Sequence, residues 1–128
     1  MVQQITKGIK VSVQSKFEGA FYKNAALHFA FAYNVTIENQ GKDAVQLTHR
    51  HWDILDALNR EETVDGEGVI GQKPVLMPGD KHTYSSGCIL AGPIGAMKGH
   101  YHMVNFATTA KFKVAIPTFI LSAPFAIN

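Results

Sequence analysis

The chain of 128 residues is long enough for one domain and leaves little for a second. Hydrophobic residues make up 46% and charged residues 17%, which excludes a disordered chain, and no apolar run approaches the ~20 residues of a membrane-spanning helix. The net charge of +2 comes without a dense Lys/Arg stripe, which argues against nucleic-acid binding. We therefore expect one domain over residues 1–128 that binds neither nucleic acid nor membrane.

Cysteine content and the N-terminal residues indicate the compartment. Cys88 is the one cysteine and cannot form an intrachain disulfide, whereas a secreted domain of this size usually carries several. Residues 1–4 lack the basic and then apolar run of a signal peptide. Both observations favour the cytoplasm.

Alternation of apolar and polar residues dominates the first third of the chain and predicts strands. Residues 9–13 read as a half-buried strand, with Ile9, Val11 and Val13 on one face. Residues 27–37 place a large apolar side chain at every odd position, so we expect this run to face a second β layer. The polar residues 38–43 predict a turn.

Residues 44–63 fit two structures. Val45 and Leu47 alternate as in a strand, but the apolar residues between 47 and 58 also fit helical spacing. The pattern alone does not decide between strand and helix. Trp52 lies opposite in phase to Val45 and Leu47, and in a strand a bulge would explain the change.

Glycines and prolines from residue 66 onward leave no room for a helix of useful length. Short strands fit at residues 82–86 and 100–106, and a last strand fits at residues 112–116, after which the phase of alternation switches beyond Pro117. Several short strands separated by turn residues predict an all-β sandwich or barrel.

The segment Gly66–Gly71 matches the dinucleotide fingerprint G-x-G-x-x-G. Prolines follow within a few residues, so the helix that this motif requires is not expected, and Asp65 and Glu67 place carboxylates where a phosphate would lie. We interpret the glycines as turn and bulge residues. Binding of an anion by backbone N–H groups, helped by Lys73, stays open as the alternative.

The histidines include two pairs with one residue between them, His49 with His51 and His100 with His102. On a strand such residues project from the same face, about 6.6–6.8 Å apart along the chain. Two such pairs on neighbouring strands could together hold one zinc or copper ion. The competing interpretation is four ordinary surface imidazoles.

Nucleophilic catalysis has little support in the sequence. The run 85–88 offers hydroxyls and a thiol but lacks the nucleophile-elbow pattern and an ordered His/acid partner. Cys88 fits a small buried residue better than a reactive thiol. We expect no enzymatic activity and no cofactor.

From Arg50 onward the chain resembles the ApaG family. The matching residues are Arg50–Trp52, Asp56, Val64–Pro74, Leu76, Pro78–Gly79, Tyr84–Gly87, Gly95–Met103 and Ile116–Phe119. The resemblance implies an immunoglobulin/fibronectin-type-III-like antiparallel β-sandwich of about seven strands, and hence a strand rather than a helix at residues 44–56. It also implies no known catalytic activity, an association of bacterial members with cobalt resistance and magnesium efflux, and a role of eukaryotic modules in protein recognition.

The chain departs from the family pattern at its histidines. His51 replaces the more usual tyrosine, and His49 and His102 are not expected family residues. A four-histidine metal site would therefore be particular to this chain.

These observations predict a binding module for a protein partner. An edge strand could bind a peptide by β-augmentation or pair two copies of the chain. Arginine and exposed tryptophan are typical interface anchors, although Trp52 fits the core equally well. The alternative function is binding of a divalent cation, or of a nucleotide or pyrophosphate at Gly66–Gly71. The candidate contact residues are Arg50, Trp52, Gly66, Gly68, Gly71 and Lys73, and the candidate metal ligands are His49, His51, His100 and His102.

Overall fold

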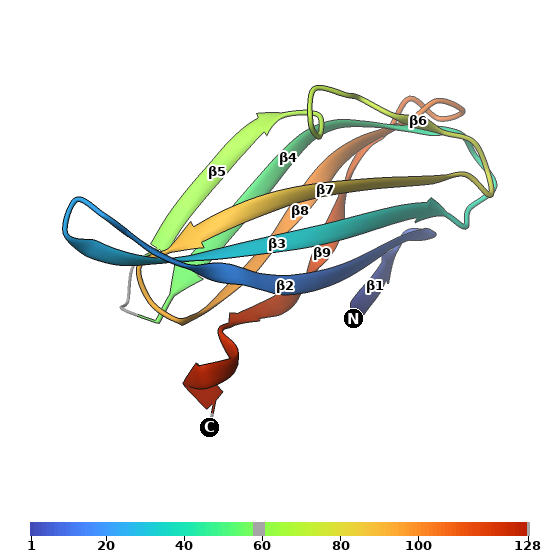
Figure 1. The fold of residues 1–128 in the computed structure, drawn as a ribbon. Coiled ribbons are helices and arrows are strands. Elements are labelled where there is room, and N and C mark those ends of the chain that lie inside the picture. Colours follow the sequence, from blue (N-terminus) through green and yellow to red (C-terminus); the bar gives the residue numbers. More distant parts are fainter. Residues whose placement is uncertain (58–60, 128) are drawn as a thin grey trace.

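The computed structural model describes residues 1–57 and 61–127 and arranges them as two antiparallel sheets packed face to face (Figure 1). The first sheet has the strand order β1 (Val2–Thr6), β2 (Ile9–Lys23), β3 (Ala26–Asn39) and β7 (Lys81–Leu90). The second has the order β5 (Glu61–Glu67), β4 (Val45–Asp56), β8 (Ile94–Asn105) and β9 (Lys111–Ser122), and β6 (Val75–Leu76) pairs with the start of β4.

The predicted fold class is confirmed. Three long strands, β2, β3 and β7, face the four strands β5, β4, β8 and β9, as in fibronectin-type-III-like sandwiches. The short strands β1 and β6 add to this frame, so the described residues contain nine strands rather than about seven. In the same residues a 3-10 turn at Pro124–Ile127 is the one helical element, and no helix has the length and apolarity needed to cross a membrane.

Strand β3 shows how the sequence pattern builds the core. Its odd-numbered residues from Phe29 to Ile37 are all buried, with at most 5% of their surface exposed, because alternate side chains of a strand point to one face. Leu27 continues the pattern but is 39% exposed. Ile9, Val11 and Val13 of β2 are buried as predicted.

Residues 45–56 form strand β4, not a helix, and the predicted bulge is present. The register of β4 against β8 shifts between Leu47 and His49. Thr48 is the extra residue, so the inward face passes from Leu47 to Arg50 and Trp52. Residues 58–60, which belong to the segment 44–63 with the helical alternative, lie outside the described residues.

A second bulge explains the change of phase at Pro117. Gly99 of β8 pairs with Ile116, but Met97 pairs with Phe119, so Pro117 and Thr118 lie opposite one residue of β8. Proline has no N–H group to donate to a neighbouring strand and is tolerated at a bulge. Phe119 and Leu121 consequently return to the core.

The sandwich is closed along one side and open along the other. On the closed side the Ser15 hydroxyl donates to the Ile120 carbonyl (3.1 Å), and the Ala115 N–H donates to the Thr6 hydroxyl (3.2 Å). On the open side the outermost strands are β7 of one sheet and β5 of the other (Figure 1).

Candidate functional site

A cleft of about 570 Å³ lies on the open side, between β7 and the strands β4 and β5. Its volume is within the usual range of ligand sites. Both sheets contribute, so the cleft exists only because two edges of the sandwich stay apart. The lining residues are Ala30, Phe31, Tyr33, Arg50, Trp52, Ile54, Glu62, Val64, Ser86, Gly87, Cys88, Ile89 and Met97.

A smaller hollow of about 230 Å³ extends the cleft toward the glycine loop at residues 68–71. Tyr33, Arg50, Trp52 and Ser86 line both hollows. The two hollows therefore form one groove that follows the inner side of β7.

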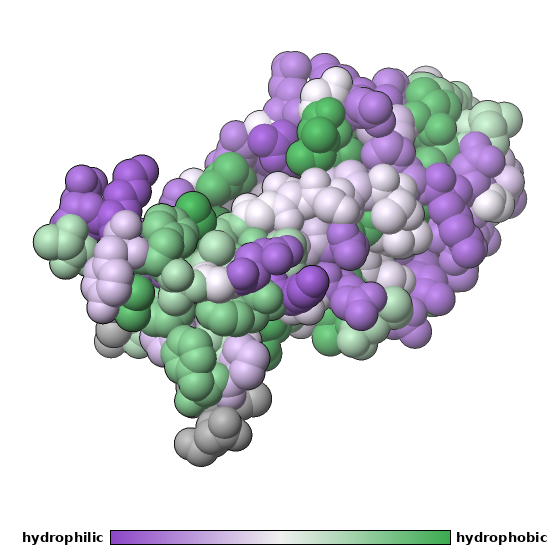
Figure 2. All heavy atoms as spheres, viewed as in Figure 1, coloured by the Kyte–Doolittle hydropathy of each residue, from purple (hydrophilic) through white to green (hydrophobic). Residues whose placement is uncertain are grey.

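Strand β7 is an edge strand without the usual protection. Natural edge strands carry lysines, prolines or bulges that prevent pairing with another chain. Apart from Lys81 at its start, β7 contains no Lys, Arg, Asp, Glu or Pro, and its pairing with β3 is regular from end to end. Figure 2 shows a pale band of intermediate hydropathy across the middle of the molecule, where the central part of this strand lies.

The opposite rim of the groove is acidic. Strand β5 has the sequence EETVDGE, with Glu61, Glu62, Asp65 and Glu67 as its acids and no basic residue. Two of these acids have partners, since Glu67 pairs with Lys73 (3.2 Å) and Asp65 contacts His51 (2.6 Å). Glu62 lines the cleft itself. Such a rim favours a cationic partner.

Arg50 crosses from β4 to the end of β5 and lies at the centre of the groove. Its guanidinium group donates to the carbonyl oxygens of Glu67 and Gly68, each at 3.0 Å. Gly66 leaves room for it, because a Cβ there would lie 2.8 Å from the guanidinium carbon. The sequence-predicted contacts Arg50, Gly66 and Gly68 are thus brought together, and Gly71 lines the smaller hollow.

The loop Gly66–Gly71 forms tight turns and leads into β6 instead of a helix. Gly68 and Gly71 have φ values of +61° and +73°, which glycine adopts at little cost. The Gly68 N–H donates to the Thr48 carbonyl, and Val69 and Gln72 exchange backbone hydrogen bonds. The amides of Gly68, Val69 and Gln72 are thus already bonded to carbonyls and are not free to bind an anion, which weighs against the pyrophosphate alternative.

Trp52 belongs to the core, not to the exposed surface. It is 3% exposed, and its ring packs against Tyr33 (5.4 Å between centroids) and Phe119 (5.9 Å). The role of exposed anchor therefore does not apply to Trp52, which forms part of the floor of the groove.

The four candidate histidines lie together on the outer face of the second sheet. His49 is opposite His102, and His51 is opposite His100. The rings of His51 and His100 are stacked, 4.7 Å apart and 16° from parallel, so their nitrogens do not converge on one point. Within residues 1–57 and 61–127, no three His, Cys, Asp or Glu side chains are arranged to hold a metal ion. The geometry does not support the four-histidine site.

The neighbours of the stacked histidines shift the two pKa values in opposite directions. A hydrogen bond with Asp65, and a weaker one with Asp53, raises the pKa of His51. Burial, followed by the nearby charges of His51 and Lys113, lowers the pKa of His100. The two rings therefore protonate in sequence rather than together.

Cys88 lines the cleft but is a poor nucleophile. Burial, with smaller effects from Glu62 and Asp56, raises the pKa of its thiol to about 11. At neutral pH the thiol is protonated, and the thiolate is the reactive form.

Reasoning from the sequence missed most of the groove, including Phe31, Tyr33, Ser86 and Cys88. These residues belong to strands far apart in the chain, so their meeting depends on the strand order. The available signal was the uncharged, proline-free stretch 82–90.

Fold and groove define a fibronectin-type-III-like β-sandwich domain with one open side. Residues 20–105 match the ApaG domain. Protein ApaG of Pseudomonas aeruginosa is 49% identical over 100 residues, covering 78% of this chain and 79% of that protein. Protein ApaG of Pectobacterium atrosepticum is 41% identical over 118 residues, covering 92% and 94%. The chain belongs to the ApaG family.

Two solved structures agree with the fold. A crystal structure described as an ApaA protein from Bordetella pertussis is 38% identical and superposes with a TM-score of 0.80, covering 91% of this chain and 94% of that one. The X-ray structure of a structural-genomics target is 34% identical and has a TM-score of 0.87, covering 91% and 88%.

Proposed function

We propose that this chain is a protein-binding module that takes an extended segment of a partner onto the free edge of β7. The observation that carries the proposal is the free edge of β7, whose residues 82–90 contain no Lys, Arg, Asp, Glu or Pro, beside a groove. An edge strand presents N–H and C=O groups that an added strand can pair with, and pockets for alternate side chains give specificity.

The groove defines the chemistry of the segment. Alternate side chains of an added strand point toward the cleft, where Phe31, Tyr33 and Trp52 offer apolar surface. The acidic strand β5 on the other rim favours lysine or arginine. We therefore expect a segment in which apolar and basic residues alternate.

The module acts by binding, not by catalysis. The thiol in the groove has a pKa of about 11, so it is not activated as a nucleophile. We place the protein in the cytoplasm, in keeping with its single, unpaired cysteine. The resemblance implies that bacterial members are associated with cobalt resistance and magnesium efflux, and we propose that such a module contributes through its protein partner.

Selection from a display library of random ten-residue peptides tests the proposal. We expect enrichment of alternating basic and apolar sequences. The variant Ile89→Lys places a positive charge on the β7 edge. It should lower the affinity for the enriched basic peptide by about tenfold or more, because like charges then repel each other at the interface.

Ile120→Lys is the matched control. Ile89 and Ile120 are 58% and 59% exposed, but Ile120 belongs to β9 on the closed side. The control should bind the peptide as the unchanged chain does. Equal binding by all three proteins, or no enriched sequence, would contradict the proposal. A concentration-dependent dimer abolished by Ile89→Lys would assign the edge to a second copy of the chain instead.

A further inference from the structure

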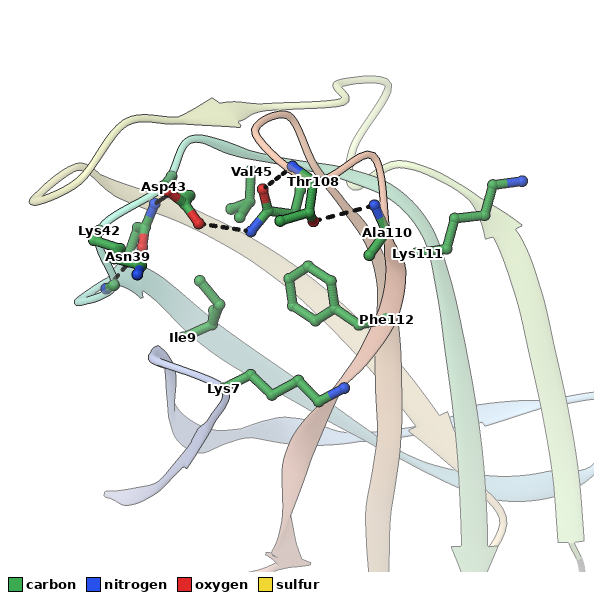
Figure 3. A pocket seen from close by; sticks show the side chains of 12 residues that line it. Lys7, Ile9, Asn39, Lys42, Asp43, Val45, Thr108, Ala110, Lys111 and Phe112 are labelled. Carbon is green, nitrogen blue, oxygen red and sulfur yellow. Dashed lines mark hydrogen bonds between the residues drawn. The ribbon is translucent and has the colours of Figure 1, made fainter.

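A second cavity, of about 320 Å³, lies at one end of the sandwich and shares no lining residue with the groove. It opens where the turns β1–β2, β3–β4 and β8–β9 meet (Figure 3). Nothing in the proposed peptide-binding function uses it.

The floor of this end cavity is apolar. Ile9 and Val45 belong to the core and are 1% and 3% exposed. Phe112 packs against the core and turns its ring toward the middle of the cavity (Figure 3). An aromatic ring on such a floor favours a flat or branched apolar ligand.

Buried hydrogen bonds hold the first wall in place. Asn39 is fully buried, and its amide nitrogen donates to the carbonyls of Asp43 and Leu76 at 2.8 and 2.9 Å. Its side-chain oxygen accepts from the Gly41 N–H. Two of these bonds fix the turn between β3 and β4, and the bond to Leu76 ties that turn to β6.

The second wall is tied to the first. The Asn105 amide nitrogen donates to the Asp43 carboxylate (3.1 Å), and its side-chain oxygen accepts from the N–H groups of Ala107 and Thr108. The cavity is therefore formed before any ligand arrives, which lowers the entropic cost of binding.

The rim carries more positive than negative charge. Lys7, Lys42 and Lys111 line it with the single acid Asp43. In the described parts of the chain, none of these lysines forms an ion pair with a carboxylate. The Lys7 ammonium lies 5.7 Å from the centre of the Phe112 ring, whereas Lys111 points away from the cavity (Figure 3).

We propose that the end cavity binds a small organic anion with an apolar body, such as an aryl carboxylate. The body lies on Phe112, and the anionic group lies at the rim, where Lys7 and Lys42 supply positive charge. Asp43 accepts from Asn105 and keeps its negative charge, but Lys7 and Lys42 outnumber it at the rim.

Three probes test this site: phenylacetate, phenylacetamide and phenethylamine. They share a phenyl ring but are negatively charged, neutral and positively charged, respectively. Titration followed by amide NMR should show the tightest binding for phenylacetate and the weakest for the amine. The shifts should be confined to residues 7–9, 39–45 and 105–112. Added salt should lower the affinity for phenylacetate and leave that for phenylacetamide unchanged, because salt screens the interaction of the lysines with an anion but not with a neutral probe.

The double variant Lys7→Gln/Lys42→Gln should bind phenylacetate about threefold to tenfold more weakly than the unchanged chain does. It should leave the neutral amide unchanged, which a merely unfolded variant would not do. Lys16→Gln, an exposed position on β2 away from the cavity, should bind all three probes as the unchanged chain does. Equal affinity for the three probes, shifts outside the end cavity, or undiminished binding by the double variant would overturn the proposal.

Discussion

Gly68 and Gly71 have similar backbone angles but different surroundings. A Cβ at Gly68 would lie 2.2 Å from the Gln72 carbonyl oxygen, whereas a Cβ at Gly71 meets nothing within 4 Å. Gly71→Ala should therefore lower the free energy of unfolding by only about 1–2 kcal/mol, which is the penalty for placing alanine in the left-handed conformation. Gly68→Ala should cost clearly more, because the backbone of the loop must also shift.

Urea denaturation of the two variants measures this difference. A larger loss for Gly68→Ala is the expected result. Equal losses would mean that the loop rearranges without penalty, and that the Val69–Gln72 bridge does not fix its shape.

The histidine pair should make stability depend on pH on both sides of 6.5. The pKa of His51 is raised above 6.5, so its contribution is fully present below that pH and is lost as pH rises through the folded pKa. The pKa of His100 is lowered, so its contribution is present above pH 6.5 and is lost as pH falls through the folded pKa. Stability from this pair is therefore greatest near pH 6.5.

NMR titration of the imidazoles checks the order of protonation. Asp65→Asn should lower the pKa of His51, because Asp65 is the main cause of the increase. Asp80→Asn is the control, because the Asp80 carboxylate accepts from the Met77 N–H and does not contact either histidine. This variant should leave the pKa values of His51 and His100 unchanged. Simultaneous titration of His51 and His100 near 6.5 would contradict the opposite shifts of the two pKa values.

At the scale of elements, the strands could be predicted wherever local alternation reports burial. The pattern of β3 predicted its inward face, and the phase change before Trp52 predicted the bulge in β4. The groove could not be predicted in this way. The groove exists because β7 is the edge strand of one sheet, β5 is the edge strand of the other, and both edges lie on the same side of the sandwich. No local sequence pattern encodes this arrangement.

The individual candidates show the same limit. Arg50 was predicted as a contact, but its bonds to Glu67 and Gly68 require the pairing of β4 with β5. Spacing placed His49 and His51 on one strand face, but the stacking of His51 on His100 depends on the register with β8.

Strand β5 should contribute charge to recognition. Glu62→Lys, on the rim of the groove, should slow association with the enriched basic peptide by about tenfold at low salt. Glu18→Lys, the same change on an exposed position of β2, should have a small effect. Stopped-flow association rates at two salt concentrations measure this. Equal slowing by both variants would mean that only the net charge matters.

At the scale of the whole molecule, the two sides of the sandwich have different roles. The contacts of β1 and β2 with β9 close one side, and Trp52 with its aromatic neighbours fills the interior. The other side keeps two sheet edges apart with a groove between them. A domain built in this way can accept an added strand without changing its core.

Hydrogen exchange of the backbone amides, with and without the enriched peptide, tests this claim most directly. Binding along β7 should protect the outward-facing amides of residues 81–90 and leave β1 and β9 unchanged. Protection confined to the β1–β9 side, or unchanged exchange throughout β7 in the peptide complex, would contradict the account.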